Sequence, residues 1–178
     1  EINYIYDDVE NYQFADGTYN VQEIGFDNDR IITDDMAQNI STGTGDDTVT
    51  TGLGNDRINT GAGADVISSG AGNDNINSGA GNDTIDAGLG KNHIRAGAGD
   101  DRVTITEGGS KQQEVVSGGE GTDTVIFEGD RADYSISHED NSGRYVVTTI
   151  STGEINYIYD DVENYQFADG TYNVQEIG

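Results

Sequence analysis

Residues 42–104 read as seven consecutive nonapeptides without a gap: TGTGDDTVT, TGLGNDRIN, TGAGADVIS, SGAGNDNIN, SGAGNDTID, AGLGKNHIR and AGAGDDRVT. With the positions numbered one to nine, positions two and four are always Gly, and position eight is always Val or Ile. Position six is Asp in every copy except the sixth, where it is Asn92. A fixed short period is typical of a solenoid, so this stretch decides the fold.

The chemistry of one nonapeptide explains its period. Two glycines at alternate positions allow a tight turn that side chains would forbid. The turn directs carbonyl oxygens to one side, and the position-six Asp adds a carboxylate, which together suit Ca²⁺. The residues after the Asp place one aliphatic side chain inward at the strand period of two. Two copies therefore make one 18-residue coil, with two parallel sheets facing each other across a thin core.

The seven copies in register resemble the RTX calcium-binding β-roll, whose pattern is G-G-x-G-x-D-x-U-x. The resemblance implies an all-β fold, a right-handed parallel β-roll. The chain departs from the family pattern at position one, which is Thr, Ser or Ala instead of Gly. A second departure is Lys91-Asn92, where a neutral ligand replaces a charged one and a cation lies beside it.

The same resemblance implies where calcium binds. Each ion lies between two turns that are 18 residues apart, and binds carbonyls of positions one and three plus the Asp of one turn, and carbonyls of positions two and four plus the Asp of the next. The turn pairs are Asp47 with Asp65, Asp65 with Asp83 and Asp83 with Asp101 on one edge, and Asp56 with Asp74 and, more weakly, Asp74 with Asn92 on the other. These pairs imply about five or more Ca²⁺ ions.

The predicted metal-site residues follow from this scheme. They are Thr42, Gly43, Thr44, Gly45, Asp47, Thr51, Leu53, Asp56, Thr60, Gly61, Ala62, Gly63, Asp65, Ser69, Gly70, Ala71, Gly72, Asp74, Ser78, Gly79, Ala80, Gly81, Asp83, Gly88, Gly90, Asn92, Gly97, Gly99 and Asp101. Weaker candidates, in degenerate outer turns, are Asp29, Gly119, Gly121 and Asp123.

The nine-residue register also extends beyond the seven copies. Counting back places Gly25 at position two, Asp29 at position six, and Ile31 and Ile40 at position eight. After Thr104 there are four extra residues, and then Val116 and Val125 regain position eight. We therefore expect the calcium-binding roll to span 24–127, with a longer loop within 105–117, centred on 108–111.

Residues 128–178 are expected to form a β-rich capping region. The strand-like runs ADYSIS, RYVVTTI and EINYIY are separated by turn formers, which predicts an antiparallel cap at the C-terminal end of the roll. Repeat proteins need an atypical cap over the terminal coil. We expect its aromatic side chains to pack there, namely Tyr157, Tyr159, Tyr165, Phe167 and Tyr172. The run DDVENYQFADGTY resembles a segment that often follows RTX rolls, but it suggests no chemistry of its own.

A second repeat has a much longer period. Residues 1–25 recur without a change at 154–178, an offset of 153 residues. The favoured interpretation is a tandem array, in which 1–23 is the tail of the preceding unit and the neighbouring units are partners. The alternative is a duplication introduced by engineering. Since no initiator Met or signal peptide opens the chain, we expect Glu1 to be a cut end and the chain to be a fragment.

Composition excludes several function classes. The 34 acidic and 8 basic residues give a net charge of −26, which disfavours nucleic acid as a partner. Only 33% of residues are hydrophobic, so the chain lies near the disordered class unless cations assist folding. The absence of Cys removes thiolate metal sites, and no apolar run approaches the ~20 residues that span a bilayer.

Nothing in the sequence indicates catalysis. His93 and His138 are far apart, and His93 falls on a strand position that holds Thr, Arg, Val or Asn in other copies. Hydrolase and phosphate-loop motifs are absent, and carboxylate pairs are too abundant to be informative. We predict that the chain is not an enzyme.

Three functions remain open. The favoured one is a calcium-binding module that folds on meeting extracellular Ca²⁺ and acts as a rigid extender repeat of a large secreted or cell-surface bacterial adhesin, exported by type I secretion. The second is the secretion and folding module of an RTX toxin or enzyme. The third is an ice- or polysaccharide-binding surface. A regular Thr or Asx row suited to ice is absent at position three, which holds Thr44, Leu53, Ala62, Ala71, Ala80, Leu89 and Ala98.

Overall fold

A computed structural model describes residues 2–4, 12–13, 20–25, 28–33, 35–108 and 112–177, with backbone alone before residue 28. Sheet A contains, in spatial order, β1 (Ile2–Tyr4), β3 (Asn20–Gly25), β5 (Asn39–Thr44), β7 (Arg57–Ala62), β10 (Asn75–Ala80), β13 (His93–Ala98), β15 (Val115–Glu120), β19 (Ile155–Tyr159), β18 (Arg144–Thr149) and β17 (Tyr134–Glu139). Sheet B contains β2 (Tyr12–Gln13), β4 (Arg30–Ile32), β6 (Thr48–Thr50), β8 (Val66–Ser68), β11 (Thr84–Asp86), β14 (Arg102–Ile105), β16 (Thr124–Phe127), β20 (Asn164–Phe167) and β21 (Gly170–Asn173). Between the sheets, β9 (Ala71–Gly72) pairs with β12 (Leu89–Gly90), and a 3-10 turn, η1, covers Arg131–Asp133.

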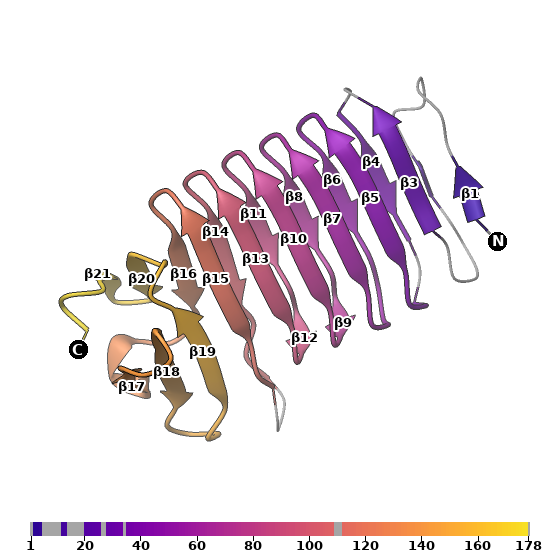
Figure 1. Cartoon of the computed structure of the whole chain (residues 1–178). Coiled ribbons are helices and arrows are strands. Elements are labelled where there is room, and N and C mark those ends of the chain that lie inside the picture. Colours follow the sequence, from indigo (N-terminus) through magenta and orange to yellow (C-terminus); the bar gives the residue numbers. More distant parts are fainter. Residues whose placement is uncertain are drawn as a thin grey trace.

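The chain alternates between the two sheets and so winds as a solenoid (Figure 1). Within the repeats all pairing is parallel, and paired residues are one 18-residue coil apart, as Ile58 is from Ile76 and Ile76 from Ile94. Between β13 and β15 the offset grows, because His93 pairs with Val115. The predicted parallel β-roll and its four-residue insertion are therefore confirmed. The centre of the predicted loop, 109–111, lies outside the described residues.

The core is a narrow double column of side chains. Every position-eight residue from Ile31 to Val125 is 0–2% exposed, including those of the degenerate outer coils. Two residues further along each strand, position one also faces inward, and it is small: Thr60, Ser69 and Ser78 are completely buried. Larger side chains are buried at the equivalent place only where no regular glycine turn follows, at Ile105 and Phe127.

The C-terminal end confirms the predicted antiparallel cap. β19 first pairs in parallel with β15, and β20 with β16, so parallel stacking continues past residue 127. β18, β17 and β21 then add in antiparallel orientation. In the core of this end, the rings of Phe127, Tyr134, Phe167 and Tyr165 form a buried cluster, and the centroids of contacting rings are 5.1–6.4 Å apart.

The expected packing of cap aromatics holds for part of the set. Tyr165 and Phe167 are buried, and Tyr172 packs against them. Tyr157 and Tyr159 are only partly buried and lie on the outer face of sheet A, so the prediction for these two was wrong. The strand alternates, and Ile158 between them takes the inward position.

Candidate calcium sites

The glycine turns stack directly on one another along both edges of the roll. At Gly61, φ is +103°, and a Cβ atom would collide with the carbonyl oxygen of Gly43 one coil earlier. The position-four glycines meet the same restriction, as Gly63 does against Gly45. Positions two and four must therefore be Gly because the turns are in backbone contact, in addition to the turn's need for positive φ. This contact aligns the position-six side chains into two columns.

The first-edge column joins the turns that lead from sheet A to sheet B. It consists of Asp29, Asp47, Asp65, Asp83, Asp101 and Asp123, each 1–4% exposed. In each pair, Oδ1 accepts the backbone N–H of the aspartate one coil earlier. Asp47 N donates to Asp65 at 2.8 Å, and Asp65 N donates to Asp83 at 2.8 Å. The same bond recurs at both ends of the column. The structure thus brings together every predicted first-edge pair.

The second-edge column contains Asp56, Asp74 and Asn92, and it repeats this pattern. Asp56 N donates to Asp74 Oδ1 and Asp74 N to Asn92 Oδ1, both at 2.8 Å. Asn92 therefore preserves the stacking bond, because an amide oxygen accepts as a carboxylate does, but it carries no charge. The predicted neutral member of the column has the place that the sequence indicated.

The Oδ2 atoms of the column aspartates show whether these residues fit Ca²⁺. The Oδ2 atoms of Asp47, Asp56, Asp65, Asp83, Asp101 and Asp123 are buried and have no hydrogen-bond partner in the described part of the chain. A buried carboxylate oxygen without a partner is strongly unfavourable. In the scheme that the RTX resemblance implies, backbone carbonyls of the turns would complete an oxygen-only donor set. The donors therefore fit a hard, oxygen-binding cation such as Ca²⁺.

Comparison with known families agrees with this donor set. The family described as RTX calcium-binding nonapeptide repeat (four copies) matches residues 32–67, 41–76 and 68–103. Residues 32–103 are RTX repeats. Among curated proteins none matches the chain. RTX repeats are structural repeats that bind calcium in general, and their presence here supports a calcium-binding β-roll. Of the described residues, none forms a helix of the length and hydrophobicity that crossing a membrane requires.

Electrostatics in the RTX columns favours neutralisation. Burial raises the pKa of Asp47 and of Asp83 to about 6, with a smaller contribution from the neighbouring column carboxylates, while hydrogen bonds to these groups oppose the rise. Burial likewise raises the pKa of Asp56, Asp65 and Asp101 above the usual value. Without a cation, the folded roll therefore holds charge that its surroundings disfavour.

Position one of these RTX repeats has a structural role that explains its departure from Gly. The hydroxyl of Thr42 donates to the carbonyl of Thr60 at 2.9 Å, Thr60 donates to Ser78, and Ser78 to Ala96. On the second edge Ser69 Oγ lies 2.7 Å from Asp74 Oδ2 and 2.9 Å from the Ala87 carbonyl oxygen, and its single proton can be donated to either acceptor.

Both columns continue beyond the RTX motif through residues that the sequence did not single out. On the first edge, Glu163 Oε2 accepts the N–H of Asp123 at 2.8 Å. On the second edge, Glu114 Oε1 accepts from Asn92 Nδ2 at 3.1 Å, and Asn156 Oδ1 accepts the N–H of Glu114 at 2.9 Å. The segment DDVENYQFADGTY therefore has a role that the sequence did not suggest, because its Glu163 completes the first column.

The weaker predicted residues lie in regular positions. A Cβ atom at Gly119 would meet the carbonyl of Gly97, and one at Gly121 the carbonyl of Gly99, as in the regular turns. The carboxylate of Asp123 is surrounded by Asp101, Glu163 and Asp161. Burial, together with these three charges, raises its pKa to about 6.

Proposed function

We propose that this chain is an RTX module that folds when it binds extracellular Ca²⁺ and then serves as a rigid extender unit of a secreted adhesin. The observation that carries the proposal is the set of buried carboxylate oxygens without partners, among the described residues, in both columns. The ions would lie between turns one coil apart, about five in number, held by the pairs from Asp47/Asp65 to Asp83/Asp101, by Asp56/Asp74 and more weakly by Asp74/Asn92.

Magnitudes support a folding switch. Column carboxylates one strand spacing apart, about 4.8 Å, repel by about 3 kcal/mol at an effective dielectric of ~20. Each buried Val or Ile contributes only ~1.5–3 kcal/mol, against ~1–2 kcal/mol of ordering per residue. An ion that binds only the folded state adds ~2.7 kcal/mol at a hundredfold excess over its Kd, so five would add ~13 kcal/mol. That sum is comparable with the whole stability of a typical domain.

Calcium concentration then determines where the module folds. Extracellular calcium modules have Kd values of about 10⁻⁴–10⁻³ M. With such an affinity, the chain stays unfolded in the cytosol, where it is competent for export, and folds outside the cell. The ion supplies positive charge and coordination between adjacent turns. The chain supplies the aligned carboxylates and the close-packed backbone that holds them in place.

The extender role is supported by the 153-residue recurrence. The residues of β19 and β20 occur again, unchanged, near the start of the chain. At the C-terminal end these residues form a coil on the roll, and at the start β1 and β2 pair with β3 and β4. One recurring segment therefore stacks against an RTX roll in both places, as a joint between tandem units would. The second candidate, a secretion and folding module of a toxin or enzyme, shares the calcium switch but not the recurrence.

Circular dichroism tests the switch. We expect little β signal in EDTA and a full β signal at millimolar Ca²⁺. Mg²⁺ at the same concentration should be much less effective, because this smaller ion requires near-octahedral geometry and gives up its water reluctantly. A complete β signal in EDTA that Ca²⁺ does not change would refute the proposal. To separate the extender from the secretion module, small-angle scattering should be measured on a protein with two 153-residue units. In millimolar Ca²⁺, a rigid extender of two units should have about twice the maximum dimension of a single unit, whereas two flexibly joined units should give a broad, shorter distribution of dimensions.

A further inference from the structure

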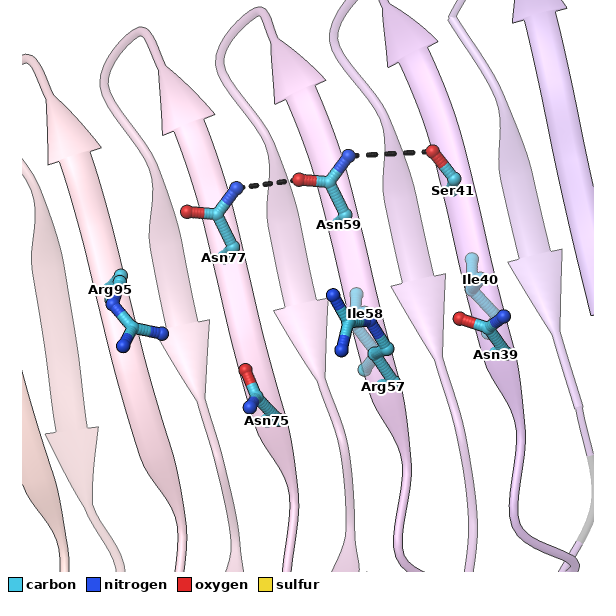
Figure 2. A pocket seen from close by; sticks show the side chains of 9 residues that line it. All are labelled: Asn39, Ile40, Ser41, Arg57, Ile58, Asn59, Asn75, Asn77 and Arg95. Carbon is cyan, nitrogen blue, oxygen red and sulfur yellow. Dashed lines mark hydrogen bonds between the residues drawn. The ribbon is translucent and has the colours of Figure 1, made fainter.

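The outer face of sheet A has a groove that the calcium columns do not use (Figure 2). Positions seven and nine of neighbouring strands point outward there and form two rows along the roll axis. The rows are Asn39, Arg57, Asn75 and His93, and Ser41, Asn59, Asn77 and Arg95. Between them is a hollow of about 550 Å³ whose floor is the strand backbone at Ile40 and Ile58, the side chains of which face the core.

The charge of this groove is opposite to that of the rest of the molecule. The chain carries 34 acidic residues, yet neither row contains one. Arg57 and Arg95 are exposed, and neither has a carboxylate within 4.0 Å among the described residues. The acidic side chains of the repeats are concentrated in the turns at the two edges, so this face offers unpaired guanidinium groups. An anionic ligand is the complement of such a surface.

The groove also contains an ordered row of neutral polar groups. Asn77 Nδ2 donates to Asn59 Oδ1, and Asn59 Nδ2 donates to Ser41 Oγ (Figure 2). These amides are therefore held in one orientation at the coil spacing. Beyond Arg95 the row continues into a second hollow of about 170 Å³, lined by His93, Arg95, Ser117 and Tyr159. The groove thus runs along the axis from an amide row, past a guanidinium, to an aromatic ring, and its acidic limit is at Ser117, whose hydroxyl donates to Asp161 Oδ2 at 2.6 Å.

We propose that this groove binds a linear polysaccharide that carries carboxylate groups and lies along the roll axis. Arg57 and Arg95 would pair with carboxylates of the sugar chain, since a guanidinium matches a carboxylate with two parallel hydrogen bonds. The amides of Asn59 and Asn77 would bind hydroxyls, and the ring of Tyr159 would pack against a sugar face. This function is additional to the extender role, because it gives each module a ligand of its own.

An acidic peptide fits the same groove less well. β5, β7, β10 and β13 are each paired on both sides, so no strand edge is open for a peptide backbone among these four strands. The rows offer no apolar side chain that could form a pocket for an anchor residue. A polyphosphate such as nucleic acid would meet the repulsion of a net charge of −26. A hydroxyl-rich anionic sugar chain uses both the guanidinium groups and the amides, and a short chain keeps the repulsion from the net charge small.

Isothermal titration calorimetry of the full chain with tetragalacturonate tests this proposal. The oligomer is chosen short so that Ca²⁺ does not gel it, and folding at millimolar Ca²⁺ is first verified by circular dichroism. We expect binding, with Arg57→Gln and Arg95→Gln each weakening it about three- to tenfold and the double variant abolishing it. Arg30→Gln removes the same charge from the opposite sheet and should leave the affinity unchanged.

Two further ligands distinguish the alternatives. The methyl ester of tetragalacturonate keeps the hydroxyls but loses the charge, and we expect it to bind at least tenfold more weakly. Tetraglutamate carries the same charges on a peptide and should not bind measurably. The proposal is overturned by any of three results: no binding of tetragalacturonate to the folded chain, binding that the arginine variants do not alter, or equal binding of tetraglutamate. The second result would indicate Ca²⁺ bridging to the acidic edges.

Discussion

At the scale of single residues, each column aspartate uses its two oxygens differently. Oδ1 accepts a backbone N–H from the coil before, as Asp74 does from Asp56. Oδ2 of most members is buried without a partner among the described residues. Asn92 separates the two properties, because it keeps the backbone bond and lacks the charge. Substitution of one aspartate therefore removes a stacking bond and, in the proposed scheme, a ligand of up to two ions.

We predict that Asp74→Ala lowers calcium-dependent stability more than Asp123→Ala. In the proposed scheme Asp74 contributes to two sites, whereas Asp123 contributes to at most one. Two lost ions correspond to about 5 kcal/mol at a hundredfold excess over Kd and one to about 3 kcal/mol. For a chain of this size the Tm would fall by about 10–20 °C and 5–10 °C, respectively.

A calcium titration of Tm measures both variants. Asp74→Asn is the matched control, because it keeps the acceptor of the backbone bond as Asn92 does, so its loss of Tm should be smaller than that of Asp74→Ala and should come from calcium binding alone. Equal losses for the two alanine variants would contradict the sharing of one aspartate between two ions.

At the scale of elements, the turn is the unit that the sequence constrains most tightly. A glycine turn stacks on the turn before it with backbone against backbone, so Gly61 is restricted both by its positive φ and by the carbonyl of Gly43. Gly153, in the turn that connects β18 to β19, also has positive φ (+74°), but a Cβ atom added there would meet no atom of the described residues within 4 Å. The two glycines separate the conformational cost of a side chain from its steric cost.

We therefore expect Gly61→Ala to destabilise the folded chain by about 3 kcal/mol or more, and Gly153→Ala by about 1 kcal/mol. The free energy of unfolding in urea at millimolar Ca²⁺ measures both. If the two variants lost the same stability, the close contact between turns would be energetically unimportant, and the stacked-turn explanation of the glycine pattern would fail.

At the scale of the whole molecule, a chain with a net charge of −26 and a thin core can fold stably only if its buried carboxylates are neutralised. Calcium is one means, and protons are another. Burial raises the pKa of Asp47, Asp83 and Asp123 to about 6 in the metal-free roll, above the usual 3.8. A raised folded-state pKa contributes stability that is complete below pH 3.8 and is lost as the pH rises through 6.

In calcium-depleted buffer we predict that lowering the pH from about 7.5 to about 5 increases the β content, because protonation removes both the burial penalty and the repulsion between coils. At subsaturating Ca²⁺ we predict the opposite trend, in which lowering the pH decreases the β content, since protons compete with the ion for the same carboxylates. Circular dichroism at both pH values, with and without Ca²⁺, reads out the two trends. A metal-free chain that is less folded at about pH 5 than at about pH 7.5 would show that the column charges do not oppose folding.

The period of nine by itself determined the parallel roll, its inward aliphatic column and the alignment of the aspartates. Each of these is local: two glycines impose the turn, and the strand alternation fixes which side chain faces inward. The spacing therefore placed Ile31, Ile40, Val116 and Val125 in the core even where the rest of the motif had decayed.

Only the tertiary structure decided which residues meet when their separation in the sequence does not follow the period of nine. Glu163 lies 40 residues from Asp123, and Asn156 lies 42 from Glu114, so no period could connect them. They complete the columns because the chain returns from the β17–β18 hairpin to stack one more coil on the roll. The groove on sheet A likewise exists only because the coils bring Arg57 and Arg95 onto one face.

The duplicated segment shows the same limit most clearly, because identical residues have different structures. Asn20–Gly25 forms β3, which pairs with β5 of the roll, whereas in the identical 173–177 the strand β21 ends at Asn173 and turns follow. A strand needs a partner for its backbone hydrogen bonds, and at the C-terminal end β18 already occupies the free edge of β19. The sequence encodes the ability to form a strand, and the neighbouring edge decides whether it forms.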